Sequence, residues 1–288
     1  MNTPHTVQSL DLEPRATDRR AVIGRTTGRR HGPVTRVFSP SDLGQWLKPF
    51  VFLDHFDVPP TRQTSFAMHP HSGISTLTIL LSGTVSYEDT TGAHGHLGAG
   101  GVEWFQAGAG AWHEGRPVDQ SRIHGYQLWL ALPPALELSP PRGQYLSADV
   151  IPEAGPARVV LGQYDGQRSP VAALPGQTCL HVRLEDGACW TYRPGAGQTV
   201  AWTHVNQGTL LVSGQHLHGE LAVFEPSEQS IEFRAQGAVD LIVASAIAHP
   251  HELVLGDYSV HTSLEALRAG EREITRVGSS LHPHGRTA

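Results

Sequence analysis

Residues 66–83, FAMHPHSGISTLTILLSG, place two histidines directly before one of the longest apolar runs of the chain. The run between Gly73 and Gly83 has the length and the β-branched composition of a buried strand, and the two glycines are turn signals. Residues two apart on a strand point to the same face, so His69 and His71 can reach one ion. The stretch predicts a barrel strand with two imidazoles at the mouth of the barrel.

Short runs of the same kind recur on both sides of this stretch. They combine β-branched and aromatic residues and lie between turn signals, as strands of sandwiches and barrels do. The chain has 31 Gly, 21 Pro and only 17% charged residues, which suits a turn-rich all-β protein better than a helical bundle. The runs are VTRVF (34–38), PFVFLDHF (49–56), STLTILL (75–81), TVSYED (84–89), GVEWF (101–105), YQLWLAL (126–132), ARVVLGQY (157–164), TCLHVRLE (178–185), ACWTYRP (188–194), TVAWTHV (199–205), GTLLVSG (208–214), ELAVFEP (220–226), SIEFRA (230–235) and VDLIVASA (239–246).

The length of 288 residues predicts two domains, because it exceeds one typical core. Prolines at 133–134 and 140–141, followed by ADVIPEAGPAR (148–158), give the most linker-like composition in mid-chain. The second half echoes the turn glycines and apolar spacing of the first, which predicts two copies of one barrel. We place a flexible tail at 1–20, the first barrel at 21–150, the second at 151–276 and a tail at 277–288. A capping-box pattern at 262–265 predicts a short helix that closes the second barrel.

Composition also excludes several classes of partner. A net charge of -6 and a pI near 6.3 offer no basic surface for nucleic acid. No apolar run is long enough to span a membrane, and the first 20 residues lack the apolar core of a signal peptide. Two cysteines in the whole chain fit a reducing compartment. We therefore expect a cytoplasmic protein that binds neither nucleic acid nor membrane.

The 18 histidines form five His-x-His pairs, whereas chance placement would give about one. Only the pair at 69 and 71 enters a strongly apolar strand and has a third histidine suitably placed. That third residue is His113, which follows a glycine-rich turn in GGVEWFQAGAGAWHEGRP (100–117). A His-x-His pair with one distant histidine is the minimum set for an open-sided metal centre. We predict His69, His71 and His113 as the ligands of one divalent metal ion. The other pairs are His94/His96, His216/His218, His249/His251 and His282/His284.

Several longer segments resemble the pirin family of bicupins, over residues 21 to 275. They are PFVFLDHFDVPP (49–60), HPHSGISTLTILLSGTVSYEDTTG (69–92), GVEWFQAGAGAWHEGRP (101–117), HGYQLWLALPP (124–134) and GDYSVHTSLEALRAG (256–270). The resemblance implies two stacked cupin barrels, with the metal in the first and no ligands left in the second. It implies Fe(II), with nickel, copper, manganese or zinc as alternatives. It also implies either a flavonol (quercetin) dioxygenase or a metal- or redox-dependent regulator that binds a transcription factor or a metabolic enzyme.

One position departs from the pirin pattern. Pirins carry a glutamate ligand two residues after the third histidine, but this chain has Gly115 there and Glu114 one residue early. A shift of one residue on a strand turns a side chain to the opposite face. We therefore expect Glu114 to be a solvated loop carboxylate, unless a bulge returns it to the metal. The general cupin alternative, a glutamate four residues after the second histidine, is replaced by Ser75.

The loss of this glutamate shapes the expected chemistry. An ion held by three neutral imidazoles keeps its full charge and favours an anionic bidentate ligand, such as the enolate of a flavonol. Without the carboxylate, a candidate general base is missing, and general-base assistance contributes about 10²–10⁴ in rate. We therefore expect slow oxidation of small aromatic hydroxy-ketones, or else metal-dependent binding of a protein partner.

Overall fold

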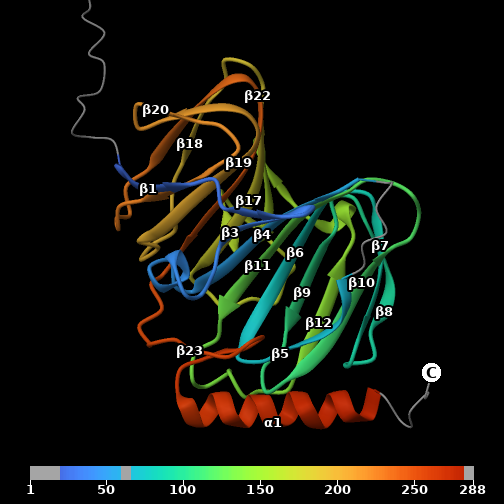
Figure 1. Cartoon of the computed structure of the whole chain (residues 1–288). Coiled ribbons are helices and arrows are strands. Elements are labelled where there is room, and N and C mark those ends of the chain that lie inside the picture. Colours follow the sequence, from blue (N-terminus) through green and yellow to red (C-terminus); the bar gives the residue numbers. More distant parts are fainter. Residues whose placement is uncertain (1–19, 60–65, 282–288) are drawn as a thin grey trace, which may run out of the picture.

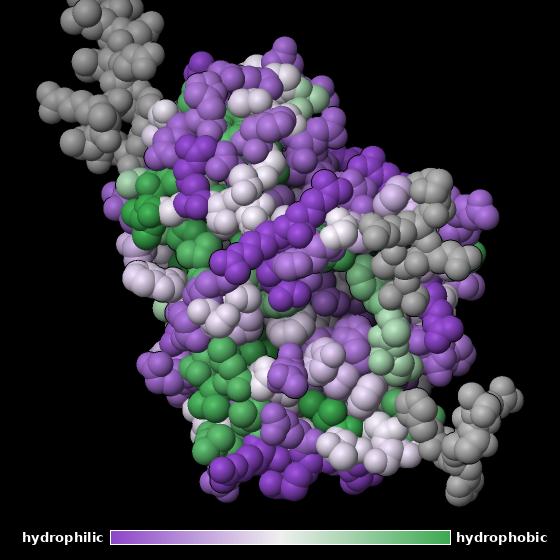
Figure 2. Space-filling view, in the orientation of Figure 1, coloured by the Kyte–Doolittle hydropathy of each residue, from purple (hydrophilic) through white to green (hydrophobic). Residues whose placement is uncertain are grey.

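The computed structural model describes residues 20–59 and 66–281, so the tail expected at 1–20 lies, except for Arg20, outside the described residues. Two β-barrels lie one above the other, and a single long helix runs along the far end of the first barrel (Figure 1). This confirms the expected all-β fold with two barrels and a C-terminal helix. Polar side chains cover most of the face shown in Figure 2, because the apolar faces of the strands are turned inward.

The first barrel consists of a seven-stranded antiparallel sheet, ordered β12-β9-β6-β11-β4-β3-β2, and a four-stranded sheet, ordered β5-β10-β7-β8. Their apolar residues alternate with polar ones or, in the central strands, form continuous buried runs. The strands are β2 (Arg29–His31), β3 (Val34–Phe38), β4 (Phe50–Val58), β5 (Phe66–His71), β6 (Ile74–Ser82), β7 (Thr84–Asp89), β8 (His94–Gly98), β9 (Val102–Gln106), β10 (Ala111–Pro117), β11 (Ile123–Ala131) and β12 (Arg142–Leu146).

The second barrel is built from one nine-stranded sheet, in which the long strands β19 and β22 curve enough to pair with strands on both sides. Along the chain, β12 belongs to the seven-stranded sheet of the first barrel, and the next strand, β13, belongs to the nine-stranded sheet. The strands are β1 (Val22–Thr26), β13 (Glu153–Ala154), β14 (Ala157–Leu161), β17 (Gln177–Leu184), β18 (Cys189–Tyr192), β19 (Val200–Val212), β20 (Gln215–Leu217), β21 (Leu221–Phe224) and β22 (Ile231–Ala246). Two small ribbons, β15 (Gln163–Tyr164) with β16 (Gln167–Arg168) and β23 (Val254–Leu255) with β24 (Val260–His261), and the 3-10 turns η2 (Leu43–Gln45) and η3 (Ala148–Val150) complete the elements.

The two barrels share a core. One apolar cluster joins residues of the seven-stranded sheet to residues of the nine-stranded sheet, and Trp202 lies fully buried within it. Phe38 and Phe50 of the first half contact the Trp202 ring edge-on, with centroids 5.9 and 5.7 Å away. Such aromatic pairs are each worth about 0.5–1.5 kcal/mol beyond their buried area. The interface therefore stabilises both barrels together.

The first strand of the chain, β1, belongs to a different barrel from the one expected from the sequence. Strand β1, which we placed in the first barrel, pairs with β21 and so extends the sheet of the second. Just before it, the buried side chain of Arg20 donates from Nε to the carbonyl of Glu225 and from Nη2 to that of Thr199. This pairing satisfies the free edge of β21, and no local pattern could reveal it because the partners lie at opposite ends of the sequence.

The closing helix α1 (Leu264–Leu281) also differs from the expectation. It continues past residue 276, and it packs on β5 and β10 of the first barrel, whereas we had assigned it to the second. The indole Nε1 of Trp112 donates to the carbonyl of Ile274 at 3.0 Å, and Gly278 allows the close approach, since an added Cβ would lie 2.5 Å from the indole. Residues 282–288 of the expected tail lie outside the described residues. In the described part of the chain, no helix is both long and apolar enough to cross a membrane.

Candidate metal centre

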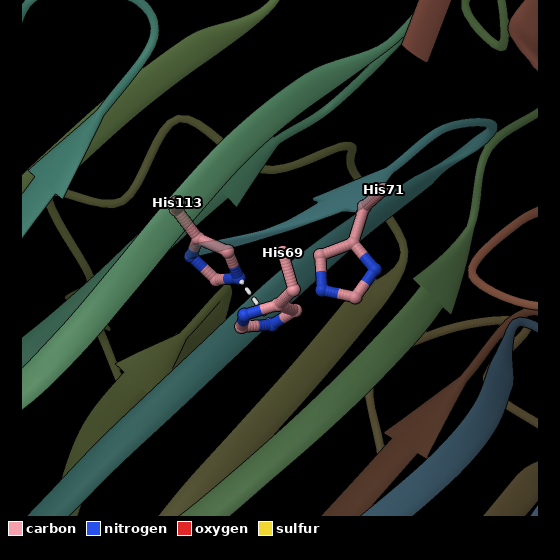
Figure 3. A group of neighbouring side chains, drawn as sticks. All are labelled: His69, His71 and His113. Atoms are coloured by element: carbon pink, nitrogen blue, oxygen red, sulfur yellow. Dashed lines mark hydrogen bonds between the residues drawn. The ribbon is translucent and has the colours of Figure 1, made fainter. Parts of the chain in front are cut away.

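Two neighbouring strands bring the three predicted histidines together. His69 and His71 lie on β5 and His113 on β10, and the antiparallel register sets His113 directly opposite His69. One ligand nitrogen from each ring lies within 4.8 Å of the other two, and the three rings turn toward one another (Figure 3). Within residues 20–59 and 66–281, no other group of three His, Cys, Asp or Glu side chains is arranged this way. We call these residues the histidine triad.

Hydrogen bonds fix the tautomer of each ring in the triad. The Nδ1 of His69 lies 2.7 Å from the carbonyl of Ala67, that of His71 lies 3.2 Å from the carbonyl of Tyr258, and that of His113 lies 2.8 Å from Glu103 Oε1. All three partners are acceptors, so each Nδ1 must carry the proton and donate it. The three Nε2 atoms are left with lone pairs.

These lone pairs face each other without a proton to share. The Nε2 atoms of His69 and His113 are 3.1 Å apart, and the buried Nε2 of His71 has no hydrogen-bond partner. Burial, with the neighbouring His113 adding to it, lowers the pKa of His69 to about 4 and that of His71 well below its usual value. Both rings are therefore neutral at pH 7. Three convergent lone pairs, on two buried rings and one half-buried ring, form a donor set that a cation could satisfy, and imidazole nitrogens suit a first-row transition metal.

Glu103 on β9 is a functional residue that the sequence analysis missed. Its carboxylate is buried, accepts from His113 Nδ1 at 2.8 Å and from the hydroxyl of Thr78 at 2.6 Å. Burial raises its pKa, but the electrostatic effect of the adjacent His113 ring and the hydrogen bonds from His113 and Thr78 more than offset this, so the carboxyl stays ionised. A carboxylate behind a ligating histidine orients the ring and raises its basicity. The signal in the sequence was a lone glutamate within an otherwise apolar strand.

Glu114 is not available to the triad. The register between β10 and β7 runs regularly through this position, and the irregularity between β10 and β5 adds its extra residue on β5. The carboxylate of Glu114 instead forms an ion pair with Arg116 at 2.7 Å. The expectation of a solvated loop residue is wrong in detail, because Glu114 lies within a strand and its side chain is only 11% exposed. Gly115, on the same face of the strand as His113, lines the cavity beside the triad.

That cavity has a volume of about 100 Å³. The polar residues in its wall include the triad members His69 and His113 and also Asp54, Thr78, Glu103, Glu114 and Gln127, and aromatic rings such as those of Phe66 and Tyr87 line other parts. An apolar cavity with a few convergent polar groups is the usual form of a small-molecule site. His69 and His113 of the triad therefore face a small, mainly apolar cavity.

Other carboxylates and histidine pairs do not join the triad. Asp54 lines the cavity but forms an ion pair with Arg36, and Asp57 forms one with Arg122. The pairs at 94/96, 216/218 and 249/251 have no third ligand within reach in the described part of the chain. The pair at 282/284 lies outside the described residues.

Comparison with known proteins now decides the family. A family model described as Pirin matches residues 32–130. A Pseudomonas aeruginosa protein named "Putative quercetin 2,3-dioxygenase" is 34% identical over 229 residues, which cover 74% of this chain and 80% of that protein. A pirin-like protein of Caulobacter vibrioides is 31% identical over 212 residues, which cover 68% of this chain and 72% of that protein. The chain belongs to the pirin family.

Solved structures support the fold of this pirin. A quercetin 2,3-dioxygenase from Acinetobacter baumannii matches with a TM-score of 0.79 and 24% identity, covering 90% of this chain and 98% of that one. A bacterial pirin from Escherichia coli, solved in complex with nickel(II), matches with a TM-score of 0.60 and 20% identity, covering 81% and 97%. The resemblance expected from the sequence is thereby confirmed, along with the fold of two cupin barrels.

Proposed function

We propose that this pirin binds one divalent transition metal through the Nε2 atoms of His69, His71 and His113. The observation that carries the proposal is the set of three lone pairs, each fixed by an acceptor on Nδ1, that converge without a proton between them. Fe(II) is the ion we propose, with nickel, copper, manganese and zinc as alternatives that imidazole also accepts. The nickel(II) complex of the Escherichia coli pirin supports a late first-row metal in this family.

We propose further that the loaded protein slowly oxidises flavonols such as quercetin with O₂. The relative from Pseudomonas and the structural match from Acinetobacter, both named for quercetin 2,3-dioxygenase, support this substrate class. When bound, the ion would supply a Lewis-acidic position for an anionic oxygen ligand and the redox chemistry that O₂ requires.

The chain's own residues have separate tasks in this proposal. Glu103 keeps the proton on Nδ1 of His113 and so holds Nε2 as a ligand. It is a positioning residue and not a general base, because both of its oxygens already accept hydrogen bonds from His113 and Thr78. No carboxylate occupies the position of Gly115, and the carboxylates of Asp54 and Glu114 in the cavity wall are held in ion pairs with arginines, so the hydroxyl proton of a substrate must pass to solvent. This predicts a slow enzyme.

The size of the cavity limits the substrate. Sites for drug-sized ligands have volumes of about 300–1,000 Å³, whereas this cavity has about 100 Å³. A flavonol therefore requires lining side chains, Phe66 or Tyr87 among them, to move. The isolated chelating ring, as in a 3-hydroxy-4-pyranone, needs less room and should compete with quercetin for the same site.

Two measurements test the proposal. Elemental analysis of protein purified without added metal should find one transition metal per chain in the wild type and much less in His113→Ala. An oxygen electrode should then record quercetin-dependent O₂ uptake by the loaded wild type and none by the variant. If fully loaded protein consumes no O₂ with any flavonol and any of the five metals, the enzyme proposal fails, and the metal-dependent regulatory protein takes its place.

We also infer a reducing, cytoplasmic location. Cys179 is buried, Cys189 is exposed, and both thiols are free. Burial raises the pKa of the Cys179 thiol to about 12, which keeps it unreactive. Fractionation of cells followed by immunodetection would test this location.

A further inference from the structure

A second group of imidazoles lies where the two barrels meet, apart from the histidine triad. His55 on β4 and His124 on β11 belong to the first barrel, and Asn206 on β19 belongs to the second. The Nε2 atoms of the two histidines are 2.8 Å apart, and the Nε2 of His124 also lies 3.0 Å from Asn206 Oδ1. We call these three residues the inter-barrel cluster.

The orientation of the Asn206 amide follows from its other neighbour. Its Nδ2 donates to Asp240 Oδ1 at 3.1 Å, and an ionised carboxylate can only accept. The Oδ1 of Asn206 must therefore face the imidazoles. Asp240 is itself held by His181 Nε2 at 2.9 Å and by Arg183 Nε at 3.1 Å, so the amide cannot easily turn over.

The inter-barrel cluster consequently brings together three atoms that each offer a lone pair when both imidazoles carry their proton on Nδ1. A single proton on His124 Nε2 could serve His55 and Asn206 only as a shared bond, which is weaker than two separate ones. A second proton is disfavoured: burial and the neighbouring His124 lower the pKa of His55 to about 4, and burial lowers the pKa of His124. Both rings are neutral at pH 7, the form in which imidazole binds metals.

The surrounding charges do not oppose a cation. Arg122 is a positive neighbour of both imidazoles, and Asp57 neutralises it through two contacts of 2.5 and 2.6 Å. Asp240 adds a negative charge behind Asn206. The three side chains of the inter-barrel cluster are partly exposed, so an ion can reach them from solvent.

We propose that His55 Nε2, His124 Nε2 and Asn206 Oδ1 form a second metal site, for Zn²⁺ or a similar late first-row divalent ion, with water completing the coordination. A tetrahedral ion with bonds of about 2.0–2.1 Å needs ligand nitrogens about 3.3 Å apart. The two rings would therefore separate by about 0.5 Å from their present spacing on binding. Because its ligands come from both barrels, the ion would join the two barrels.

The test isolates this site by first removing the histidine triad. The full chain with His69→Ala and His113→Ala, stripped by chelation, is titrated with Zn²⁺ and followed by calorimetry and thermal melting. We expect about one remaining equivalent, a higher melting temperature with Zn²⁺, and at least tenfold weaker binding once His124→Gln or His55→Gln is added. The matched control adds His94→Ala and His96→Ala, an exposed pair on β8, and should leave the remaining binding within about twofold.

Each alternative outcome overturns the proposal. It fails if the triad-free protein binds no Zn²⁺ up to millimolar concentration, if the control change removes the binding, or if His55→Gln and His124→Gln leave it unaltered. Should both glutamine variants fail to fold, the triad-free parent is loaded with one equivalent of Cu²⁺ and examined by electron spin-echo spectroscopy. Two coupled imidazoles support the site, and one or none excludes it.

Discussion

The central strands of the two barrels pair in the same way, but the first barrel has polar side chains in its interior where the second has apolar ones. In the first, Thr78 of β6 pairs with Glu103 of β9. At the matching place in the second, Thr203 of β19 pairs with Ala222 of β21. The Thr78 hydroxyl donates to the carboxylate of Glu103, whereas the Thr203 hydroxyl donates to the carbonyl of Ile242. The same strand arrangement can therefore enclose either a polar site or an apolar core, depending on the residues at a few inward-facing positions.

The same correspondence extends to the histidine triad. When LSGTV (81–85) is written against NQGTL (206–210), His69 and His71 fall on Pro194 and Ala196. The second barrel thus lacks these two histidines, and its interior is filled by apolar side chains such as Phe233 and Tyr192. Polar atoms remain inside the first barrel because an ion can satisfy them, and the second barrel replaces them with packing.

Removing one histidine of the triad should have the largest effect on the difference between the barrels, because metal binding by the first barrel should be lost. His113→Ala leaves two imidazoles on β5 and frees the carboxylate of Glu103, so metal affinity should fall by more than about 100-fold, which is the upper end for an outer-shell change. The fold should persist, because apolar strand packing supplies most of its stability. Calorimetry measures the affinity. His216→Ala, an exposed histidine of the second barrel, is the control and should change nothing.

A cavity in the second barrel should affect stability and leave the metal untouched. Phe233 is fully buried, and Phe→Ala changes in cores cost about 3–5 kcal/mol. Phe105→Ala should cost a similar amount and also weaken metal binding, since the Phe105 ring stacks on His113 with centroids 4.7 Å apart. Urea unfolding and metal titration of both variants separate the two effects. Loss of metal affinity in Phe233→Ala would show that the barrels are not independent in this respect.

The sequence could predict what depends on local pattern. Alternating strands, turn glycines and the spacing of His69 and His71 are visible within short windows, and so the barrels and the proximity of these two residues were accessible. The place of β1 and of α1 depends on partners far along the chain. Glu103 stood out in the sequence only as a glutamate within an apolar run, and the folded structure was needed to show that it contacts His113.

Neutralising Glu103 tests whether its hydrogen bond with Nδ1 of His113 supports metal binding in the first barrel. Glu103→Gln keeps the shape of the side chain but replaces a charged acceptor behind His113, and such changes cost about 10- to 100-fold in metal affinity. Glu220→Gln is the matched control, because that carboxylate forms an ion pair with Arg25 in the second barrel, away from the triad. Metal titration should separate the two variants by at least about tenfold. Equal affinities would mean that Glu103 has only a structural role.

Acid should destabilise the metal-free protein through its buried histidines. Burial and neighbouring imidazoles lower the pKa of His69 to about 4 and that of His204 to about 3 in the folded state. Unfolded histidines titrate near pH 6.5, so as the pH falls the unfolded chain takes up protons first and stability decreases. Each residue should contribute a loss of about 1 kcal/mol between pH 7 and pH 5.5. Urea midpoints at the two pH values measure this loss of stability, and His204→Gln should make the loss smaller by about 1 kcal/mol.

Adding a carboxylate at Gly115 tests whether the interior of the first barrel is ready to accept one. A Cβ built at this position would meet only Phe66 Cδ2, at 4.0 Å, and the residue is on the same face of β10 as His113. Gly115→Glu should therefore fold normally, tighten metal binding by on the order of threefold to tenfold and raise any flavonol oxidation, because it supplies an anionic ligand or a base.

The opposite result is expected in the second barrel. Ala222 is fully buried at the place that corresponds to Glu103, in a core without imidazoles to pair with. Ala222→Glu should destabilise the protein strongly and bind no metal, because a buried carboxylate without a partner is costly. Calorimetry measures the metal affinity of the two variants, and urea unfolding measures their stability. If Gly115→Glu weakens metal binding, or if Ala222→Glu is tolerated as well as Gly115→Glu, then inward polar positions do not distinguish the two barrels.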